Sequence, residues 1–205
     1  MRALVAIAMF VAACGYPPLD SSGGDAGAGH DVNPTHDGKG SIDAADLCQA
    51  PASYGAATAT DQSGDYFPGN QNNPDELDYA GSITATDVLA ISLFDGTPPF
   101  PDTLTTGTFN LAGETDFSNC GTCVLVAAQC NNCDLSTGAG VGSWYMASAG
   151  SLKLTSLTPT IAGSLTGATL IHVAIDFSNG NTTVSGDGCT TKITSVSFSS
   201  PVTQH

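Results

Sequence analysis

From Cys48 onward, the chain consists of short runs rich in Thr, Val, Ile, Leu and Phe. Gly, Asn, Asp or Pro interrupts these runs every eight to twelve residues or so. This texture is typical of β-strands joined by short connections. None of the runs shows the apolar stripe of a helix, so the sequence predicts an all-β domain. The predicted strands span Asp87 to Phe94, Thr106 to Leu111, Cys123 to Gln129, Trp144 to Ala149, Ser151 to Leu157, Ile161 to Leu165, Leu170 to Phe177 and Lys192 to Ser199.

The run from Leu170 to Phe177 shows the clearest period-two alternation. Its odd positions, Ile171, Val173, Ile175 and Phe177, are predicted to share one face of a sheet. Eight or nine such strands indicate an antiparallel β-sandwich of jelly-roll or immunoglobulin-like type, but they do not reveal the strand order.

Charge excludes one class of partner. The 205 residues include 4 Lys and Arg against 19 Asp and Glu, which gives a net charge of −15. Such a chain repels polyanions, so we expect no nucleic-acid partner. The sequence also contains no run of about 20 apolar residues, and we therefore expect no membrane-spanning helix.

The first thirteen residues read as a signal peptide: Arg2 precedes a short apolar stretch that ends at Ala13. The last three of these residues and the next one, Val11-Ala12-Ala13-Cys14, resemble the lipobox of bacterial lipoproteins. This resemblance implies a lipoprotein signal peptide over residues 1–13, acylation of Cys14 and attachment to a lipid bilayer. Because Gly15 rather than Asp follows the cysteine, the outer membrane of the cell envelope is favoured. Plain secretory cleavage is the alternative.

The cysteine count agrees with acylation. Seven cysteines cannot all pair in an oxidising compartment, whereas lipidation of Cys14 leaves six that can. The six predicted disulfide residues are Cys48, Cys120, Cys123, Cys130, Cys133 and Cys189. We expect a local bridge between Cys130 and Cys133 and two long-range links among the other four.

Two other interpretations of the Cys-x-x-Cys pairs stay open. They could form a zinc site, but a strand between Cys123 and Cys130 would separate these residues by roughly 23 Å, too far for one ion. Cys120 and Cys123 could form a redox dithiol, although Val-Leu-Val after them is a poor helix start. Structural disulfides are favoured, and no metal ligand is assigned.

Residues 14–47 are rich in Gly, Pro, Ser and Asp, and they predict a flexible acidic linker behind the lipidated cysteine. Within this linker, Asp31 to Asp46 resembles a calcium-binding loop, but the spacing between Asn33 and Asp37 is too long. A second acidic set could bind calcium in a loop or simply keep it soluble: Asp61, Asp65, Asp75 and Asp78.

The remaining motifs suggest no catalysis. Gly138 to Ser143 lacks the Lys of a phosphate-binding loop and predicts a flexible hairpin. Trp144 and Tyr145 could stack on a sugar, or could place one ring in the core and the other at its rim. His172 has no carboxylate or second histidine at ligand spacing, and it is interpreted as a sheet residue rather than a general base.

Several short segments of the predicted domain are similar to those of a group of secreted or lipid-anchored β-domain proteins from myxobacterial-type bacteria. They include Pro74 to Leu77, Leu93 to Gly96, Gly107 to Phe109, Cys120 to Val124, Tyr145 to Ala147 and Gly186 to Cys189. The resemblance implies one domain over residues 48–203 and provides no activity that could be transferred.

Together these features predict a non-enzymatic lipoprotein of the outer envelope that acts in binding, adhesion or envelope structure. An extracellular protein or carbohydrate is the expected kind of ligand, and its binding would use loops at one end of the sandwich. No catalytic residue is assigned. The alternative is a secreted hydrolase or thiol oxidoreductase on the same scaffold.

Overall fold

The computed structural model describes residues 48–70 and 73–205, and no residue in these ranges is helical. Accordingly, the described part holds no helix long and apolar enough to cross a membrane. Cys14, the lipobox and the acidic linker up to residue 47 lie outside it. The strands are β1 (Gly55–Thr58), β2 (Thr60–Phe67), β3 (Glu76–Ser82), β4 (Val88–Phe94), β5 (Gly107–Asn110), β6 (Thr122–Ala128), β7 (Ser143–Ser156), β8 (Thr160–Asp176), β9 (Asn181–Val184) and β10 (Thr190–Gln204).

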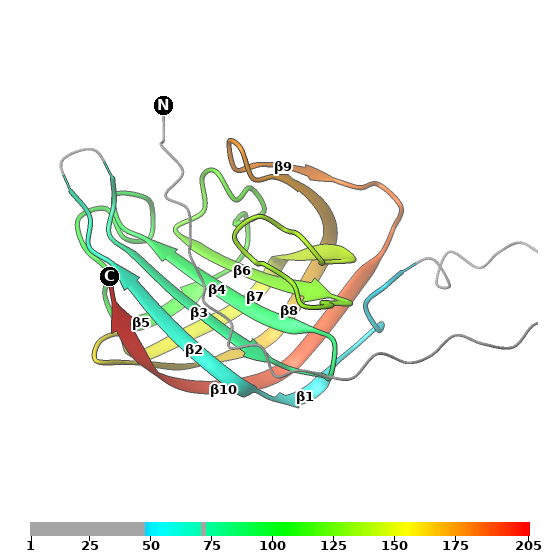
Figure 1. Cartoon of the computed structure of the whole chain (residues 1–205), viewed down its shortest axis with the longest axis horizontal. Helices are drawn as coiled ribbons and strands as arrows, with labels where there is room; N and C mark the ends of the chain where they lie inside the picture. The colour runs from blue at the N-terminus through cyan, green and yellow to red at the C-terminus, as the bar shows by residue number, and fades with distance from the viewer. Residues whose placement is uncertain (1–47, 71–72) are drawn as a thin grey trace, which may run out of the picture.

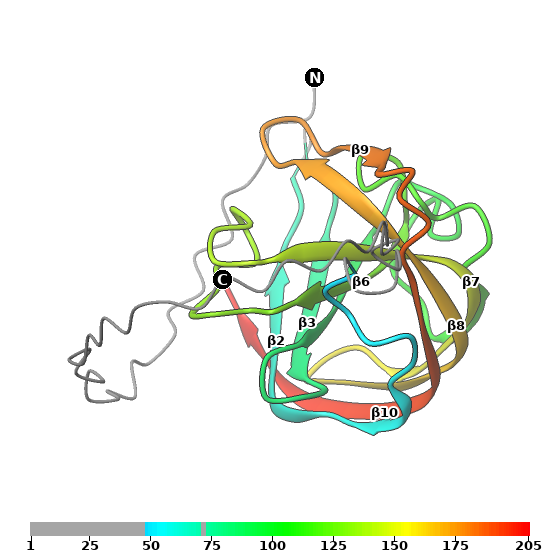
Figure 2. The same ribbon diagram turned by 90° about the vertical axis from the view of Figure 1, so that its right-hand side faces the viewer.

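All ten strands belong to one mixed sheet in the order β1-β10-β2-β3-β4-β6-β7-β8-β9, with β5 paired to β7. Because β10 also pairs with β8, the sheet closes on itself. Figure 2 shows β10 crossing below the molecule between β2 and β8. The all-β class is confirmed, but the strands form one continuous sheet rather than two. This sheet is mixed rather than purely antiparallel, since β10 runs parallel to both β1 and β2.

Long, bent strands allow this closure. β7 and β8 each combine two apolar runs that the sequence predicts as separate strands (Figure 1). In β7 the interruption is Gly150, whose φ of 125° accompanies a shift in register against β8. Such irregularities bend a strand without ending it. The breaks at Gly150 and around residue 167 are therefore bends, and the prediction of separate strands there is wrong.

Alternation divides the side chains between two faces. The inner face carries the main core, to which every strand of the closed ring contributes; Leu77, Ile91, Val126, Leu165 and Phe198 are members. The outer face of β4, β6, β7 and β8 carries a second apolar cluster. Ile171, Val173, Ile175 and Phe177 all belong to this second cluster, which confirms the shared face predicted for them.

Candidate ligand pocket on the outer face

Three loops cover the outer cluster, and each contains the same turn. Asp116, Asp134 and Asp176 are each followed by one apolar residue and then by a serine. The first oxygen of each carboxylate accepts hydrogen bonds from the serine N–H and hydroxyl: 3.2 and 2.9 Å at Asp116, 2.9 and 2.6 Å at Asp134, and 3.0 and 2.6 Å at Asp176. These contacts, led by the serine hydroxyl, hold the pKa of Asp134 and of Asp176 below its usual range.

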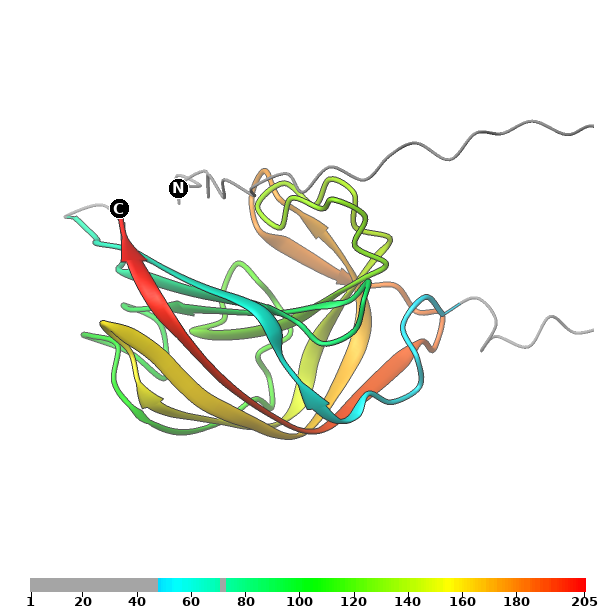
Figure 3. The same ribbon diagram turned by 60° about the horizontal axis from the view of Figure 1, so that its bottom comes forward.

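The apolar residue of each turn is thereby fixed against the sheet. It is Phe117 in the first turn, Leu135 in the second and Phe177 in the third. The first turn is also tied to β9, since Phe117 N–H donates to Thr182 Oγ1 at 2.9 Å. Figure 3 shows the loop between β6 and β7 beside the hairpin of β8 and β9. The cover of the outer face is therefore built from loops that are far apart in sequence.

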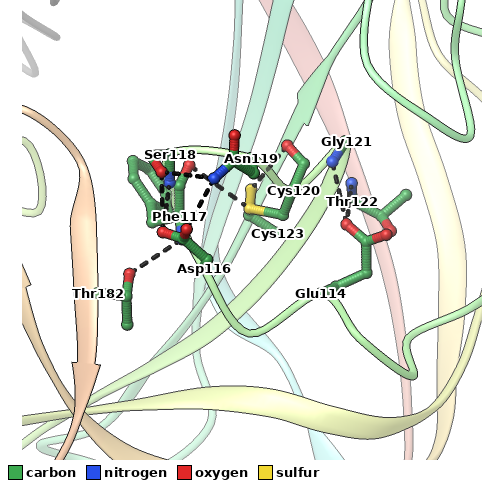
Figure 4. Close-up of a disulfide and its surroundings, with 10 residues drawn as sticks. All are labelled: Glu114, Asp116, Phe117, Ser118, Asn119, Cys120, Gly121, Thr122, Cys123 and Thr182. Carbon is green, nitrogen blue, oxygen red and sulfur yellow. Dashed lines mark hydrogen bonds between the residues drawn. A yellow bond between two sulfur atoms is a disulfide. The ribbon is translucent and has the colours of Figure 1, made fainter.

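Two disulfides fasten the cover. Cys120–Cys123 joins the first turn to β6, and Glu114 accepts hydrogen bonds from Gly121 and Thr122 N–H at 3.0 and 3.3 Å beside it (Figure 4). Cys130–Cys133, the local bridge that the sequence predicts, lies in the second loop. The third disulfide, Cys48–Cys189, spans 141 residues.

The prediction of two long-range links is therefore wrong, because Cys120 and Cys123 bond to each other. Their disulfide is 3% and 0% exposed, so an attacking thiolate has no access to it and a redox role is disfavoured. With the sulfurs of both Cys-x-x-Cys pairs in disulfides, neither pair offers the thiolates that a zinc site needs.

A cavity of about 40 Å³ lies between the cover and the sheet. This is room for about three water molecules. Most of its lining is apolar, and the residues are Ala90, Phe117, Leu125, Leu135, Trp144, Ile175 and Phe177, together with Tyr79, Asp78 and Ser92. Trp144 packs against Phe177 with ring centroids 5.5 Å apart.

Asp78, in β3, is the one carboxyl side chain of this lining. It is 3% exposed, and neither of its oxygens makes a well-formed hydrogen bond with a described residue; the Ser92 hydroxyl and the Glu76 carboxyl lie beside it as weak partners. Burial raises the pKa of Asp78 to about 6; the adjacent Ser92 hydroxyl and Glu76 carboxyl oppose this rise, and the charge of Asp65 adds to it. Burial, together with Asp78, also raises the pKa of Glu76 to about 8.

Asp87 offers a contrast within the same fold. It is 5% exposed, and its carboxylate accepts hydrogen bonds from Tyr54 Oη at 3.1 Å, Thr86 Oγ1 at 3.2 Å and Gln129 N–H at 2.9 Å. Of the two buried carboxylates in the described part of the chain, Asp87 is thus satisfied by three hydrogen bonds, whereas Asp78 makes no well-formed one and faces a cavity.

Of the other acidic residues in the predicted calcium set, Asp65 lies opposite Asp78, but the four residues do not form one site. Asp61 and Asp65 lie in β2 and Asp78 in β3, so this set does not occupy one loop. Asp65 contacts His205 Nε2 at 2.8 Å, and Asp75 accepts a hydrogen bond from Tyr66 Oη at 2.9 Å. The Asp31 to Asp46 pattern lies outside the described residues.

His172 has a carboxylate partner that its sequence neighbourhood does not reveal: its Nδ1 contacts Asp187 Oδ2. The ring also stacks on Tyr145 with centroids 5.2 Å apart. With Cys189, these residues form the one candidate metal cluster in the described ranges, but the sulfur of Cys189 is bonded to Cys48 and cannot act as a thiolate ligand.

The adjacent aromatic residues divide between the two faces. Tyr145 belongs to the inner core, and its hydroxyl accepts a hydrogen bond from Ala50 N–H at 3.3 Å. Trp144 points to the outer face and is 9% exposed, so neither ring offers an open platform for a sugar. The glycine-rich run forms the end of the β6–β7 loop, where Gly138 and Gly140 have φ of 73° and 77°.

The sequence patterns did not identify the pocket residues Ser92, Phe117, Leu135 and Phe177. They also did not predict that Asp78 is buried. One signal was present: Asp-Phe-Ser-Asn occurs twice, at residues 116–119 and 176–179. Both copies place their phenylalanine at the cavity.

No protein-family model, no curated protein and no solved structure matches the chain. A function can therefore be proposed only from the residues of this chain and their arrangement in the structure.

Proposed function

We propose that this chain is a lipid-anchored domain of the bacterial cell envelope that binds a ligand and catalyses no reaction. The anchor would be Cys14, and Gly15 after it favours the outer membrane. The resemblance to envelope proteins of myxobacterial-type bacteria belongs to the same proposal. A jelly-roll or immunoglobulin-like sandwich is the topology that the sequence predicts; the ten-stranded mixed sheet supports the all-β class and does not choose between the two topologies.

One observation carries the proposal: the six cysteines of the described part pair with one another in three disulfides. Disulfides persist in extracytoplasmic compartments, and this complete pairing leaves no partner for a seventh cysteine. Cys14 follows Val11-Ala12-Ala13, where small residues suit the lipoprotein signal peptidase. A thioether to diacylglycerol and an acylated amine would place two or more chains in the bilayer, which is enough for stable attachment.

Binding rather than catalysis is favoured by the character of the pocket. Its lining is apolar and contains one carboxyl and one hydroxyl side chain besides Tyr79. A hydrolase of the serine or cysteine type needs a nucleophile, a base within hydrogen-bond reach and an orienting group. The orienting pair His172–Asp187 stands on the opposite face of β8 from the cavity-lining Ile175, and no nucleophile is assigned to it.

Metabolic labelling with an alkyne analogue of palmitate tests the anchor in a bacterial host that processes lipoproteins. We expect the wild-type chain to carry the label and to sediment with membranes, and Cys14→Ser to lose both properties. Gly15→Ser, a neighbouring change that preserves the cysteine, should retain both. Label on Cys14→Ser, or an unlabelled wild-type chain in the cytosol, would contradict the proposal.

A further inference from the structure

The environment of Asp78 defines what the cavity can accept. Neither oxygen of this nearly buried carboxyl makes a well-formed hydrogen bond, and only the weak contacts of Ser92 and Glu76 reach it, while the surrounding walls are aromatic and aliphatic. An unpaired buried acceptor is costly, so a ligand that brings donors to Asp78 gains more than the same contact would give in water. The ligand must therefore present donors at one end and apolar surface at the other.

This requirement excludes three kinds of ligand. A sugar would bury several hydroxyls against apolar walls where Asp78 and Ser92 are the main polar partners. A neutral apolar molecule would leave both oxygens of Asp78 without a well-formed hydrogen bond. A calcium ion needs six to eight oxygen ligands, and the metal-ligating groups of the described residues gather only around His172, not here.

We propose that the cavity binds a small primary ammonium compound with a compact apolar body, whose ammonium group donates to Asp78 while its carbon atoms pack on Trp144, Phe117 and Phe177. This inference deepens the proposed binding role and rests on it, but it does not depend on the anchor. A primary ammonium group has three donors for the two oxygens of Asp78. It also gains from the faces of aromatic rings and from the net charge of −15. The cavity has room for about three waters and is partly open to solvent, so a ligand of about five non-hydrogen atoms would fill it and extend to its mouth.

Ligand binding should be coupled to proton release. The ionisable groups that face Asp78 are Glu76 on the same strand and Asp65 on β2, and Asp65 in turn contacts His205. In the empty cavity, burial keeps a proton on the Asp78 and Glu76 pair near neutral pH. A bound ammonium favours the carboxylate forms, so affinity rises with pH for as long as the amine stays charged.

Trp144 provides a direct readout, because it is the only tryptophan in the chain and it lines the cavity. The test follows its fluorescence in the full, disulfide-bonded chain as 2-methylpropylammonium is added. Three probes of similar or smaller size provide controls at equal ionic strength: 2-methylpropanol has no charge, tetramethylammonium has no donors, and ammonium chloride has no apolar body. We expect saturable binding of 2-methylpropylammonium and at least tenfold weaker binding of each control. We also expect its affinity at pH 8 to exceed that at pH 5 at least tenfold.

Variants assign the effect to the cavity. Asp78→Asn should weaken binding at least tenfold, whereas Asp102→Asn, which removes the same charge from an exposed loop residue, should leave it unchanged. A melting temperature of Asp78→Asn at or above that of the wild type shows that the loss is not unfolding. Equal binding of the alcohol or of tetramethylammonium, an unaltered affinity in Asp78→Asn, or no saturable change with 2-methylpropylammonium would overturn the ligand class. Palmitate labelling is unaffected by any of these results, so failure of the ligand class is distinguishable from failure of the anchor.

Discussion

Replacing Asp78 by Asn should stabilise the protein at neutral pH, although the residue is buried in the middle of a strand. Burial raises the pKa of Asp78 to about 6 from an ordinary value of 3.8. At 1.36 kcal/mol per unit, the ionised form therefore costs about 3 kcal/mol of folding free energy above pH 6. The amide in Asp78→Asn stays neutral and costs about 1 kcal/mol to bury, which leaves a net gain of about 2 kcal/mol.

The pH dependence follows from the sign of this shift. The folded state binds the proton of Asp78 more tightly than the unfolded state, so the wild-type free energy of unfolding falls as the pH rises from about 4 to about 6. Glu76 extends this fall toward pH 8, because the raised pKa of its carboxyl lies there. The gain in Asp78→Asn should accordingly appear at pH 7.5, whereas at pH 3.5, where the wild-type carboxyl is mostly protonated, only the loss of about 1 kcal/mol for burying the amide remains.

Urea unfolding with intact disulfides measures the effect, and Asp87→Asn is the matched control. Asp87 is equally buried, but three donors satisfy its carboxylate. The same substitution there should therefore lower the free energy of unfolding by about 1–3 kcal/mol at pH 7.5. If Asp78→Asn were no more stable than wild type at pH 7.5, or if both substitutions acted in the same direction, the reasoning about Asp78 would be refuted.

Two further predictions concern the framework. Replacing Cys48 and Cys189 by Ser should lower the free energy of unfolding by about 5 kcal/mol, because their disulfide closes a loop with a sequence separation of 141. The same replacement of Cys130 and Cys133, which are separated by 3, should lower it by only about 2 kcal/mol. Urea unfolding compares the two double variants, and equal losses would contradict the loop-closure argument. Gly163→Ala should cost about 2–3 kcal/mol, because its Cβ would overlap the Lys153 carbonyl oxygen on β7 and lie 2.8 Å from Phe198 Cζ. The control Ser164→Ala, on the same strand, should leave the melting temperature nearly unchanged. If Gly163→Ala had the same melting temperature as Ser164→Ala, the close packing of β7, β8 and β10 would be contradicted.

Local patterns predicted those strands that carry regular apolar alternation. β4 and β6, and most of β7, β8 and β10, lie where Val, Ile, Leu and aromatic residues recur. β2 escaped prediction because its sequence, Thr-Asp-Gln-Ser-Gly-Asp-Tyr-Phe, has the composition of a loop. Its position between β3 and β10 in the closed sheet, rather than its own propensity, makes it a strand.

The site was harder to predict from the sequence than the fold, because its residues come together only in the tertiary structure. Asp78 pairs with Ser92 across β3 and β4, and Ser92 pairs with Cys123 on β6, so register places the carboxyl beneath the cover. Nothing near Asp78 in the sequence separates it from the exposed Asp61. Similarly, the partner of His172 is Asp187, fifteen residues away, and the two ends of the Cys48–Cys189 link meet only in the folded chain.

The most direct test of the central claim is the intact mass of the protein isolated from the membranes of its own cells, measured before and after reduction. The account predicts a chain that begins at Cys14, carries acyl groups and gains six hydrogen atoms on reduction, from three disulfides. A chain without acyl groups, or one whose mass does not change on reduction, would contradict it.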